Sequence, residues 1–243
     1  MESNLIYSYR KVLENMGMNE EQQTQIEKQL MAHQHDSYTS DIELTEGVVL
    51  KDFQVHKGVF RPDVTFPRYF ARWLFFNQDL YAGKKVLEVG SGTGILGIVM
   101  ALYGAEQVDF TDLSPPTVEN TKANLEQFGL EKRVLQGDLF EKVDGEYDIV
   151  MFNHPFFSGN HNDNIVSHSM LGGEVLFSKF LKDAKEYLLD SGIILSSYWD
   201  FAGPENNPKV QGPKLGYTVK TKFTLDVGDG LQQGDLSIYE LRR

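Results

Sequence analysis

The 243-residue sequence contains no cysteine. This absence excludes disulfide bridges, thiolate metal sites, iron–sulfur clusters and any reaction that needs a cysteine nucleophile. Long hydrophobic runs are missing too, because the longest, near "ILGIVMALYGA", is about half of the ~20 residues that span a bilayer. The N-terminus lacks a basic segment followed by an apolar core, so the sequence predicts no secretory signal. We therefore expect a cytoplasmic protein with no membrane partner.

Basic residues are scarce relative to acidic ones. The sequence has 23 Lys and Arg against 35 Asp and Glu, which gives a net charge of -12. Broad binding to nucleic acid needs Lys and Arg to replace the counterions of the phosphates. The charge therefore argues against nucleic acid as a partner, although Arg61, Arg68 and Arg72 form a modest basic cluster that could make a local patch.

The N-terminal part of the chain has a different pattern from the rest. Apolar residues spaced three and four apart predict helices up to about residue 35, one of them starting at an Asn19 cap. Apolar and polar residues then alternate from about 40 to 62, which indicates short strands or a hairpin. We expect a helical appendage at 1–45, a connector with short strands at 46–67 and the main domain at 68–243.

Within the main domain, short β-rich runs such as "KKVLEVG" and "YDIVMFN" alternate with helical stretches. This alternation is typical of βαβ units that build a parallel sheet with right-handed crossovers. The last two runs, "GYTVKTKFTLDV" and "DLSIYELRR", flank a glycine-rich segment and predict a terminal antiparallel hairpin. The expected fold is therefore α/β: a doubly wound, mostly parallel seven-stranded sheet that ends in a hairpin.

A glycine-rich loop follows the first strand of this sheet. In "VLEVGSGTG", Gly90, Gly92 and Gly94 let the backbone approach a ligand, and the helix behind them favours an anionic group. Gly92, Gly94 and Gly97 also satisfy the dinucleotide pattern G-x-G-x-x-G. That pattern normally starts at the strand end, here Gly90, and would then need a glycine where Ile95 stands. An oxidoreductase that binds a dinucleotide is therefore kept as an alternative only.

Three acidic residues stand at informative places near the strands. Asp112 ends the second strand, where a carboxylate can accept both ribose hydroxyls of a nucleoside, or else cap the next helix. Asp138 ends the third strand and could hold an adenine amino group or be a plain turn residue. Glu88 lies inside an apolar strand, and a buried carboxylate needs partners. A cationic amino group on a ligand would be one.

The fourth strand ends in the unusual stretch "DIVMFNHPFF". Asn153, His154, Pro155 and Phe156 supply an amide, a titratable ring, a rigid turn and an aromatic face that neither strand nor helix requires. The alternative is a buried strand that ends in a turn, with its phenylalanines in the core.

Together, E-x-G-x-G-x-G, "GDLFE" and "DIVMFNHPFF" resemble class I S-adenosylmethionine-dependent methyltransferases. The likeness is greatest to the HemK/PrmC-like and small-domain enzymes whose fourth motif is N-P-P-Y or N-P-P-F. It covers about residues 58–200 and includes "VFRPDVT". The resemblance implies a Rossmann-like methyltransferase fold, catalysis in the main domain and S-adenosyl-L-methionine as cofactor. The residues that it places at the cofactor are Glu88, Gly90, Ser91, Gly92, Gly94, Asp112, Leu113, Asp138, Leu139 and Asn153.

The same resemblance implies how the fourth motif acts on a planar nitrogen. The Asn153 side-chain oxygen and the His154 carbonyl would accept hydrogen bonds from the NH₂ group, Pro155 would stiffen the turn, and Phe156 would stack on the flat group. This sequence departs from the family in two places. His154 replaces a proline, so we expect a less rigid turn with a titratable ring, and Phe156 replaces the usual tyrosine.

A second histidine-rich feature follows this motif. His154, His161 and His168 recur at equal spacing with Asp163 between them, but no element obviously brings them together, so we expect no metal site and interpret 158–170 as a lid or substrate-facing loop.

The preferred function is N-methylation of a planar nitrogen, with a protein side chain favoured over a nucleobase or small molecule. A non-catalytic cofactor-binding scaffold protein is the alternative from another class.

Overall fold

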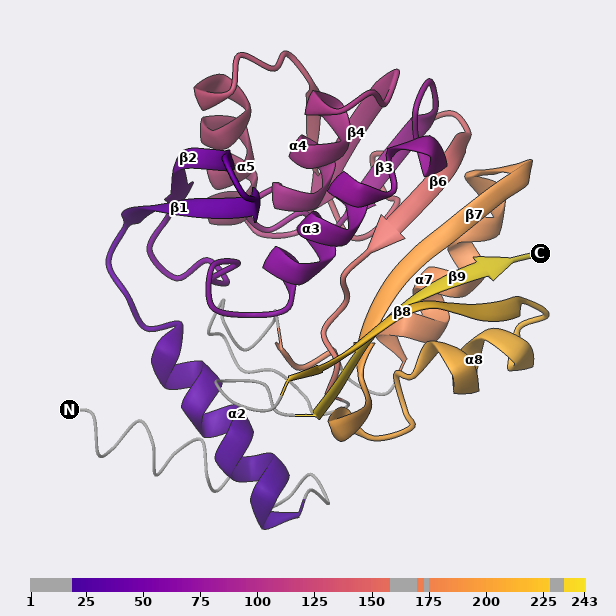
Figure 1. The fold of residues 1–243 in the computed structure, drawn as a ribbon. Coiled ribbons are helices and arrows are strands. Elements are labelled where there is room, and N and C mark those ends of the chain that lie inside the picture. Colours follow the sequence, from indigo (N-terminus) through magenta and orange to yellow (C-terminus); the bar gives the residue numbers. More distant parts are fainter. Residues whose placement is uncertain (1–18, 158–169, 173–174, 228–233) are drawn as a thin grey trace.

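The structure, a computed structural model, describes residues 19–157, 170–172, 175–227 and 234–243. Its centre is a single seven-stranded sheet (Figure 1). The strands are β3 (Lys85–Val89), β4 (Gln107–Asp112), β5 (Arg133–Gln136), β6 (Tyr147–Phe152), β7 (Leu188–Trp199), β8 (Thr218–Val227) and β9 (Gly234–Arg242). They lie in the order β5-β4-β3-β6-β7-β9-β8. The first five are parallel and β9 is antiparallel to both of its neighbours, which confirms the predicted sheet and its terminal hairpin.

The central strands are buried on both faces and are largely apolar. In β6 every residue from Ile149 to Phe152 is buried, and in β7 the run from Gly192 to Trp199 is buried without interruption. Parallel strands covered by helices on both faces show such continuous runs rather than alternation. The sequence of these strands therefore specifies a sheet that is covered on both faces. Polar side chains can reach a ligand only at the ends of such strands.

Helices cover the sheet in two groups. They are α3 (Pro67–Phe76), α4 (Ile95–Leu102), α5 (Pro115–Gln127), α7 (Leu176–Asp183) and α8 (Pro208–Lys214), with short 3-10 turns at Gln78–Leu80, Ala184–Glu186 and Asp200–Ala202. Helices α4 and α5 pack on the β3–β5 half, and α8 packs on β7, β8 and β9. Gly97 allows α4 to lie this close, because a Cβ there would come within 2.4 Å of the Phe110 ring.

The N-terminal part consists of helix α2 (Glu20–Ala32) and a hairpin of β1 (Tyr38–Thr45) and β2 (Val48–Val55). Helix α2 begins at the predicted Asn19 cap, which forms a capping box with Gln22. The helix expected before residue 19 lies outside the described residues. The hairpin starts at Tyr38, inside the segment 1–45 that the sequence assigned to the helical appendage, because alternating burial already begins there.

The hairpin is fastened to the sheet domain by buried asparagines of α5. Asn124 accepts a hydrogen bond from Gln54 N–H (2.8 Å) and Asn120 accepts one from His56 N–H (2.8 Å), while both amides donate to Gln54 O. Figure 1 shows α2 beyond this hairpin, away from the strands of the large sheet.

Strand order reverses between β3 and β6, which are neighbours in the sheet with Val89 beside Phe152. Ligands of open α/β sheets bind outside the carboxyl ends of the strands at such a switch point. The glycine loop follows β3 and the "NHPF" stretch follows β6, so the topology brings these two motifs together.

Candidate active site

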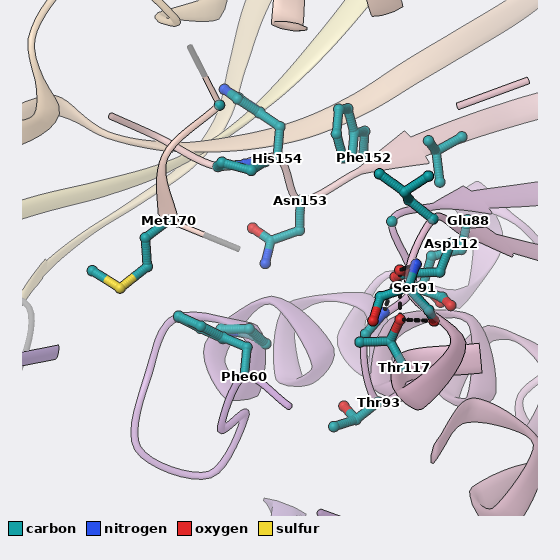
Figure 2. A pocket seen from close by; sticks show the side chains of 18 of the residues that line it. Phe60, Glu88, Ser91, Thr93, Asp112, Thr117, Phe152, Asn153, His154 and Met170 are labelled. Atoms are coloured by element: carbon teal, nitrogen blue, oxygen red, sulfur yellow. Dashed lines mark hydrogen bonds between the residues drawn. The ribbon is translucent and has the colours of Figure 1, made fainter. Parts of the chain in front are cut away.

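A cavity of about 670 Å³ opens at the carboxyl ends of β3, β4 and β6. Figure 2 shows Ser91, Asp112 and Thr117 gathered at one end, with Asn153, Phe60 and Met170 toward the other. The volume lies within the range of small-molecule sites. Residues predicted from the sequence that line it are Glu88, Gly90, Ser91, Gly92, Asp112, Leu113, Asp138, Leu139, Asn153, His154, Pro155 and Phe156.

The glycine loop curves around one end of the cavity. Gly90 has a φ of 62°, and a Cβ there would lie 2.8 Å from the Phe152 ring. Gly92 has a φ of 57° with nothing within 4 Å of a Cβ position, so the loop is open on the cavity side. Gly94 is not part of the lining: it precedes α4, and a Cβ there would meet Thr121 at 3.0 Å.

Asp112 holds the glycine loop in place. Its carboxylate accepts hydrogen bonds from Gly92 N–H (2.9 Å), from Ser114 N–H (2.9 Å) and from the Thr117 hydroxyl. A carboxylate has about four acceptor sites, so one remains for a ligand hydroxyl while the loop is held. The two interpretations of Asp112 from the sequence, ligand contact and local cap, are therefore compatible.

Asp138, Leu139 and Leu113 also line the cavity. Asp138 is exposed and its carboxylate pairs with Lys179 at 2.6 Å. Leu139 adopts a left-handed φ of 50° and its carbonyl accepts a hydrogen bond from the Thr111 hydroxyl. Leu113 leaves 56% of its side chain exposed beside the cavity, which offers an apolar surface to a flat ring.

Glu88 is a fully buried carboxylate at the floor of the cavity. It accepts a hydrogen bond from Gly97 N–H at 2.8 Å. Burial raises the pKa of the Glu88 carboxyl to about 8, the Gly97 hydrogen bond opposes this shift, and the negative charge of Asp112 adds to it. A cationic group in the cavity would favour the ionised form.

Asn153 lies just beyond the end of β6, at the other end of the cavity. Its side-chain oxygen accepts a hydrogen bond from the hydroxyl of Ser197 on β7. Ser197 is buried, so this contact fixes the plane of the amide. An amide oxygen has two lone pairs, and the second one is available to an N–H donor on a substrate.

The expectation of a loose turn with a titratable ring at His154 is wrong. The ring is 2% exposed and stacks between Phe177 (4.0 Å) and Tyr198 (5.7 Å). Its Nε2 donates to Asn206 O at 3.0 Å, and its Nδ1 faces the Ser196 hydroxyl at 3.0 Å. Burial lowers the pKa of His154 to about 3, so the ring is neutral and anchors the turn in the core.

The two phenylalanines after Pro155 differ in role. Phe156 is half-buried, lines the cavity, and meets the Tyr198 ring edge-on at 5.4 Å. Phe157 is fully buried against Trp199. Both rings border the cavity, but Phe156 is the more exposed of the two, and Phe157 belongs mainly to the core.

A family model described as the methyltransferase small domain matches residues 71–196, more than half of the chain. The chain belongs to the methyltransferase small-domain family. It is an S-adenosylmethionine-dependent methyltransferase, as the motifs predicted. This membership decides against the dinucleotide oxidoreductase that Gly92, Gly94 and Gly97 had left open.

Individual relatives differ in how much they share with the chain. A Methanocaldococcus jannaschii protein, provisionally named a protein N5-glutamine methyltransferase, is 27% identical over 188 residues, which are 75% of this chain and 91% of that protein. The ribosomal RNA small subunit methyltransferase C of Enterobacter sp. is 35% identical over 92 residues, which are 37% of this chain and 27% of that protein. The chain thus spans about a quarter of the RNA enzyme.

Among solved structures, a T. thermophilus 16S rRNA N2 methyltransferase in complex with AdoMet and guanosine aligns with a TM-score of 0.60 and 19% identity. The alignment covers 86% of this chain and 51% of that one. At this identity the likeness shows the shared fold alone.

The residues that line the cavity fit S-adenosylmethionine. The loop is open at Gly92, where no atom occupies the space in front of the backbone, and Glu88 offers a buried carboxylate that a cationic amino group would stabilise. Apolar Leu113 and acidic Asp112 lie at the same end, as a nucleoside requires. These groups therefore match a ligand that consists of an amino acid joined to a nucleoside.

Several lining residues were not among the predicted site residues, although Phe60 lies in the stretch "VFRPDVT" that the resemblance includes. Phe60 and Phe66 follow the hairpin, Met170 and Leu171 follow β6, and Gln29 comes from α2. The fourth motif predicts Asn153. Its partner Ser197 lies on β7, where nothing in the sequence marks a serine as a site residue. These positions depend on long-range packing.

Among the described residues no cluster of His, Asp and Glu could hold a metal ion. His161, His168 and Asp163 of the predicted polar loop lie outside the part of the chain that the structure describes. The described helices also include none with the length and hydrophobicity of a membrane span.

Replacing Asp112 by alanine should weaken S-adenosylmethionine binding by about 10- to 100-fold, because it removes a charged acceptor and releases the Gly92 N–H. Calorimetric titration measures this change. Asp148→Ala is the matched control: its carboxylate also accepts a backbone N–H, from Lys85 at 2.9 Å, but Asp148 does not line the cavity, so its loss should leave the affinity unchanged. Unchanged affinity in the Asp112 variant would remove it from the cofactor site.

Replacing Ser197 by alanine should lower the turnover number about 5- to 10-fold at unchanged cofactor affinity, since one orienting hydrogen bond to Asn153 is lost. Ser237→Ala is the control, because that buried hydroxyl on β9 bonds Thr224 instead. The same decrease in both variants would indicate a general packing effect.

Proposed function

We propose that the protein transfers a methyl group from S-adenosylmethionine to the planar nitrogen of a protein side chain. The observation that carries this proposal is the Asn153 amide, which Ser197 holds at the end of the cavity away from Asp112. The cofactor supplies an electrophilic methyl group when bound. The protein has to present the nitrogen to it in line, and a fixed acceptor does this.

Asn153 Oδ1 and the His154 carbonyl accept the N–H groups of the substrate in this proposal. Two acceptors orient the nitrogen and favour the build-up of electron density on it. Phe156 stacks on the flat group, which contributes about 1 kcal/mol. The buried His154 ring keeps the turn rigid in the way that a proline would, so the departure from the family motif preserves the geometry.

On the cofactor side, Glu88 would pair with the amino group, Asp112 with a ribose hydroxyl and Asp138 with the adenine amino group. Engaging both ribose hydroxyls would require Asp112 to release either Gly92 or Thr117. Gly90, Ser91 and Gly92 would lie along the amino-acid part, and Leu113 and Leu139 beside the adenine. Gly94 would support the loop from below.

The charge of the cavity favours a protein acceptor over RNA. The acidic side chains in the lining that the structure describes are Glu88, Asp112 and Asp138, and this lining includes no Lys or Arg. The predicted cluster of Arg61, Arg68 and Arg72 does not line the cavity, and the Arg61 guanidinium is engaged with Tyr38 and Asp63. Nucleic acids need cations near their phosphates. The provisional name of the M. jannaschii relative points to a glutamine side chain.

Methyl-labelled S-adenosylmethionine tests this function with cell protein and total RNA as separate acceptors. We expect label in protein, at a side-chain amide nitrogen, and none with the Asn153→Ala variant. Label in RNA alone would replace the protein acceptor by a nucleobase. Absence of transfer to either, despite cofactor binding, would reject both. The cytoplasmic location expected from the sequence stays a prediction.

A further inference from the structure

Helix α2 carries buried amide side chains where an amphipathic helix usually has apolar ones. Gln25 and Gln29 are 5% and 2% exposed and lie one turn apart on its buried face. Gln25 Oε1 and Gln29 Nε2 are both buried without a hydrogen-bond partner. Leaving such atoms unpaired destabilises a fold, so their presence needs a reason.

The position of Gln29 supplies that reason. Gln29 lines the same cavity as Asn153, and Gln25 does not. The helix ends next to Phe60, because the His33 ring that caps it lies 3.9 Å from the Phe60 ring. Phe60 lies at the Asn153 end of the cavity, away from Asp112 and the glycine loop (Figure 2). Gln29 therefore faces the side where the methyl acceptor would enter.

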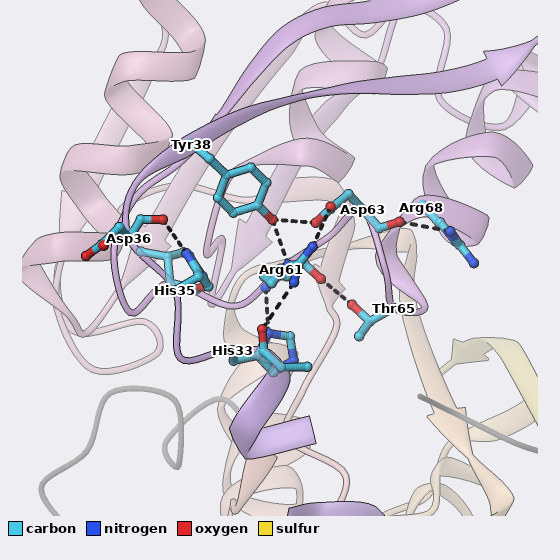
Figure 3. A network of polar contacts seen from close by, with 10 residues as sticks. His33, His35, Asp36, Tyr38, Arg61, Asp63, Thr65 and Arg68 are labelled. Atoms are coloured by element: carbon cyan, nitrogen blue, oxygen red, sulfur yellow. Dashed lines mark hydrogen bonds and ion pairs between the residues drawn. The ribbon is translucent and has the colours of Figure 1, made fainter. Parts of the chain in front are cut away.

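Helix α2 is held firmly enough to position a side chain. At its C-terminal end, Arg61 donates to Ala32 O (3.3 Å) and its backbone N–H donates to His33 Nδ1 (3.0 Å), as Figure 3 shows. The same guanidinium binds Tyr38 and Asp63, so the helix is tied to β1. At the N-terminal end, the Gln22 amide donates to Phe201 O at 3.0 Å.

We propose that Gln29 is a specificity-determining residue, whose side-chain NH₂ donates a hydrogen bond to a carbonyl oxygen of the methyl acceptor. The inference rests on the proposed function and deepens it. Asn153 Oδ1 and the His154 carbonyl are acceptors, which suit the NH₂ of a carboxamide. A donor from Gln29, which lines the same cavity, suits its C=O. The broad rotation of the terminal amide lets Gln29 turn its NH₂ toward the ligand.

This arrangement selects a carboxamide against two similar groups. A carboxylate lacks the N–H that Asn153 accepts, and a simple amine lacks the carbonyl that Gln29 satisfies. A site with unpaired buried polar atoms discriminates strongly, because the wrong ligand leaves them unpaired. A glutamine or asparagine side chain fulfils both requirements, and we take a protein glutamine side chain as the acceptor.

The test measures binding of acetyl-glutamine-methylamide to the full chain saturated with the demethylated cofactor, by NMR titration, beside thermal unfolding. Gln29→Leu should weaken the capped glutamine about 5- to 10-fold and raise the midpoint of unfolding, since an unpaired donor is removed. Gln25→Leu is the matched control, with the same chemistry one turn away: it should raise the midpoint but leave binding unchanged.

The other outcomes distinguish the two proposals. Equal weakening by both variants, or a lower midpoint for Gln29→Leu, would overturn the role of Gln29. If guanosine binds in place of the capped glutamine and depends on Gln29, the donor role stands and the protein acceptor is rejected. If neither probe binds the wild type, the Gln29 proposal fails, while the labelled-methyl experiment decides the proposed function separately.

Discussion

Replacing Asn153 by alanine is expected to reduce the turnover number by about 100-fold or more, with the dissociation constant of S-adenosylmethionine almost unchanged. The amide lies at the end of the cavity away from Asp112 and is oriented by Ser197, so its loss removes the acceptor for the substrate nitrogen while the glycine loop stays intact. Single-turnover transfer of labelled methyl measures the first quantity and calorimetry the second.

Asn77→Ala is the matched control for this experiment. The Asn77 amide donates to Trp73 O at the end of α3, and Asn77 does not line the cavity. The control should retain full turnover. If Asn153→Ala lost cofactor affinity and turnover to the same extent, the residue would belong to the cofactor site and its assigned role in the reaction would be wrong.

Replacing Glu88 by glutamine is expected to change the pH dependence of both cofactor binding and stability. In the free protein the pKa of Glu88 is raised to about 8, first by burial. A cationic amino group binds the ionised carboxylate, so the wild-type affinity should rise about tenfold per pH unit up to pH 8. The variant should lack this rise. Cofactor titrations of both proteins between pH 6 and pH 9 separate the effect of Glu88 ionisation from the effect of the ligand's own ionisation, because the second effect is common to both proteins.

The free energy of unfolding of the wild type should fall as the pH rises, whereas its cofactor affinity should rise. Because the pKa of Glu88 in the folded protein lies above 4.5, the ordinary value of a glutamate side chain, the folded state keeps its proton while the unfolded state loses it. The stabilisation is complete below pH 4.5 and is lost as the pH rises to about 8, by on the order of several kcal/mol. Glu88→Gln removes this loss, so the variant should unfold at higher denaturant concentration than the wild type at pH 8.

Glu240 provides the contrasting control. It is also buried, but Arg242 at 2.7 Å and Lys222 at 3.1 Å outweigh its burial and lower the pKa of its carboxyl. Glu240→Gln should therefore reduce stability at neutral pH and leave cofactor binding unchanged. A stability curve for Glu88→Gln that followed the wild type from pH 5 to pH 8 would show that Glu88 is ionised in the folded protein.

Local sequence patterns predicted the features that depend on neighbours along the chain. Alternating strands and helices indicated the parallel sheet, and Gly90 and Gly92 marked the loop after its first strand. Asp112 and Asn153 could be located because parallel strands end at the same edge of a sheet. Each of these residues lies where its own strand ends, so spacing in the sequence was sufficient to locate it.

Features that depend on packing between distant segments were missed. The ring of His154 turns into the core because Phe177 and Tyr198 form a slot for it, and neither is near in the sequence. Ser197 reaches Asn153 only through the pairing of β6 and β7. Gln29 belongs to a helix whose pattern indicated a buried face but not what that face would meet.

The place of β9 between β7 and β8 has a consequence for how the enzyme is made. Strand β8 is synthesised before β9, yet its only neighbour in the described sheet is β9, so it waits for the later strand to emerge from the ribosome. Until then β7, which carries Ser197, has one unpaired edge, and such edges invite association with other chains. The backbone that orients Asn153 is thus completed only when the last strand inserts. A growing chain therefore passes through a stage in which it has its glycine loop but lacks a secured site for methyl transfer.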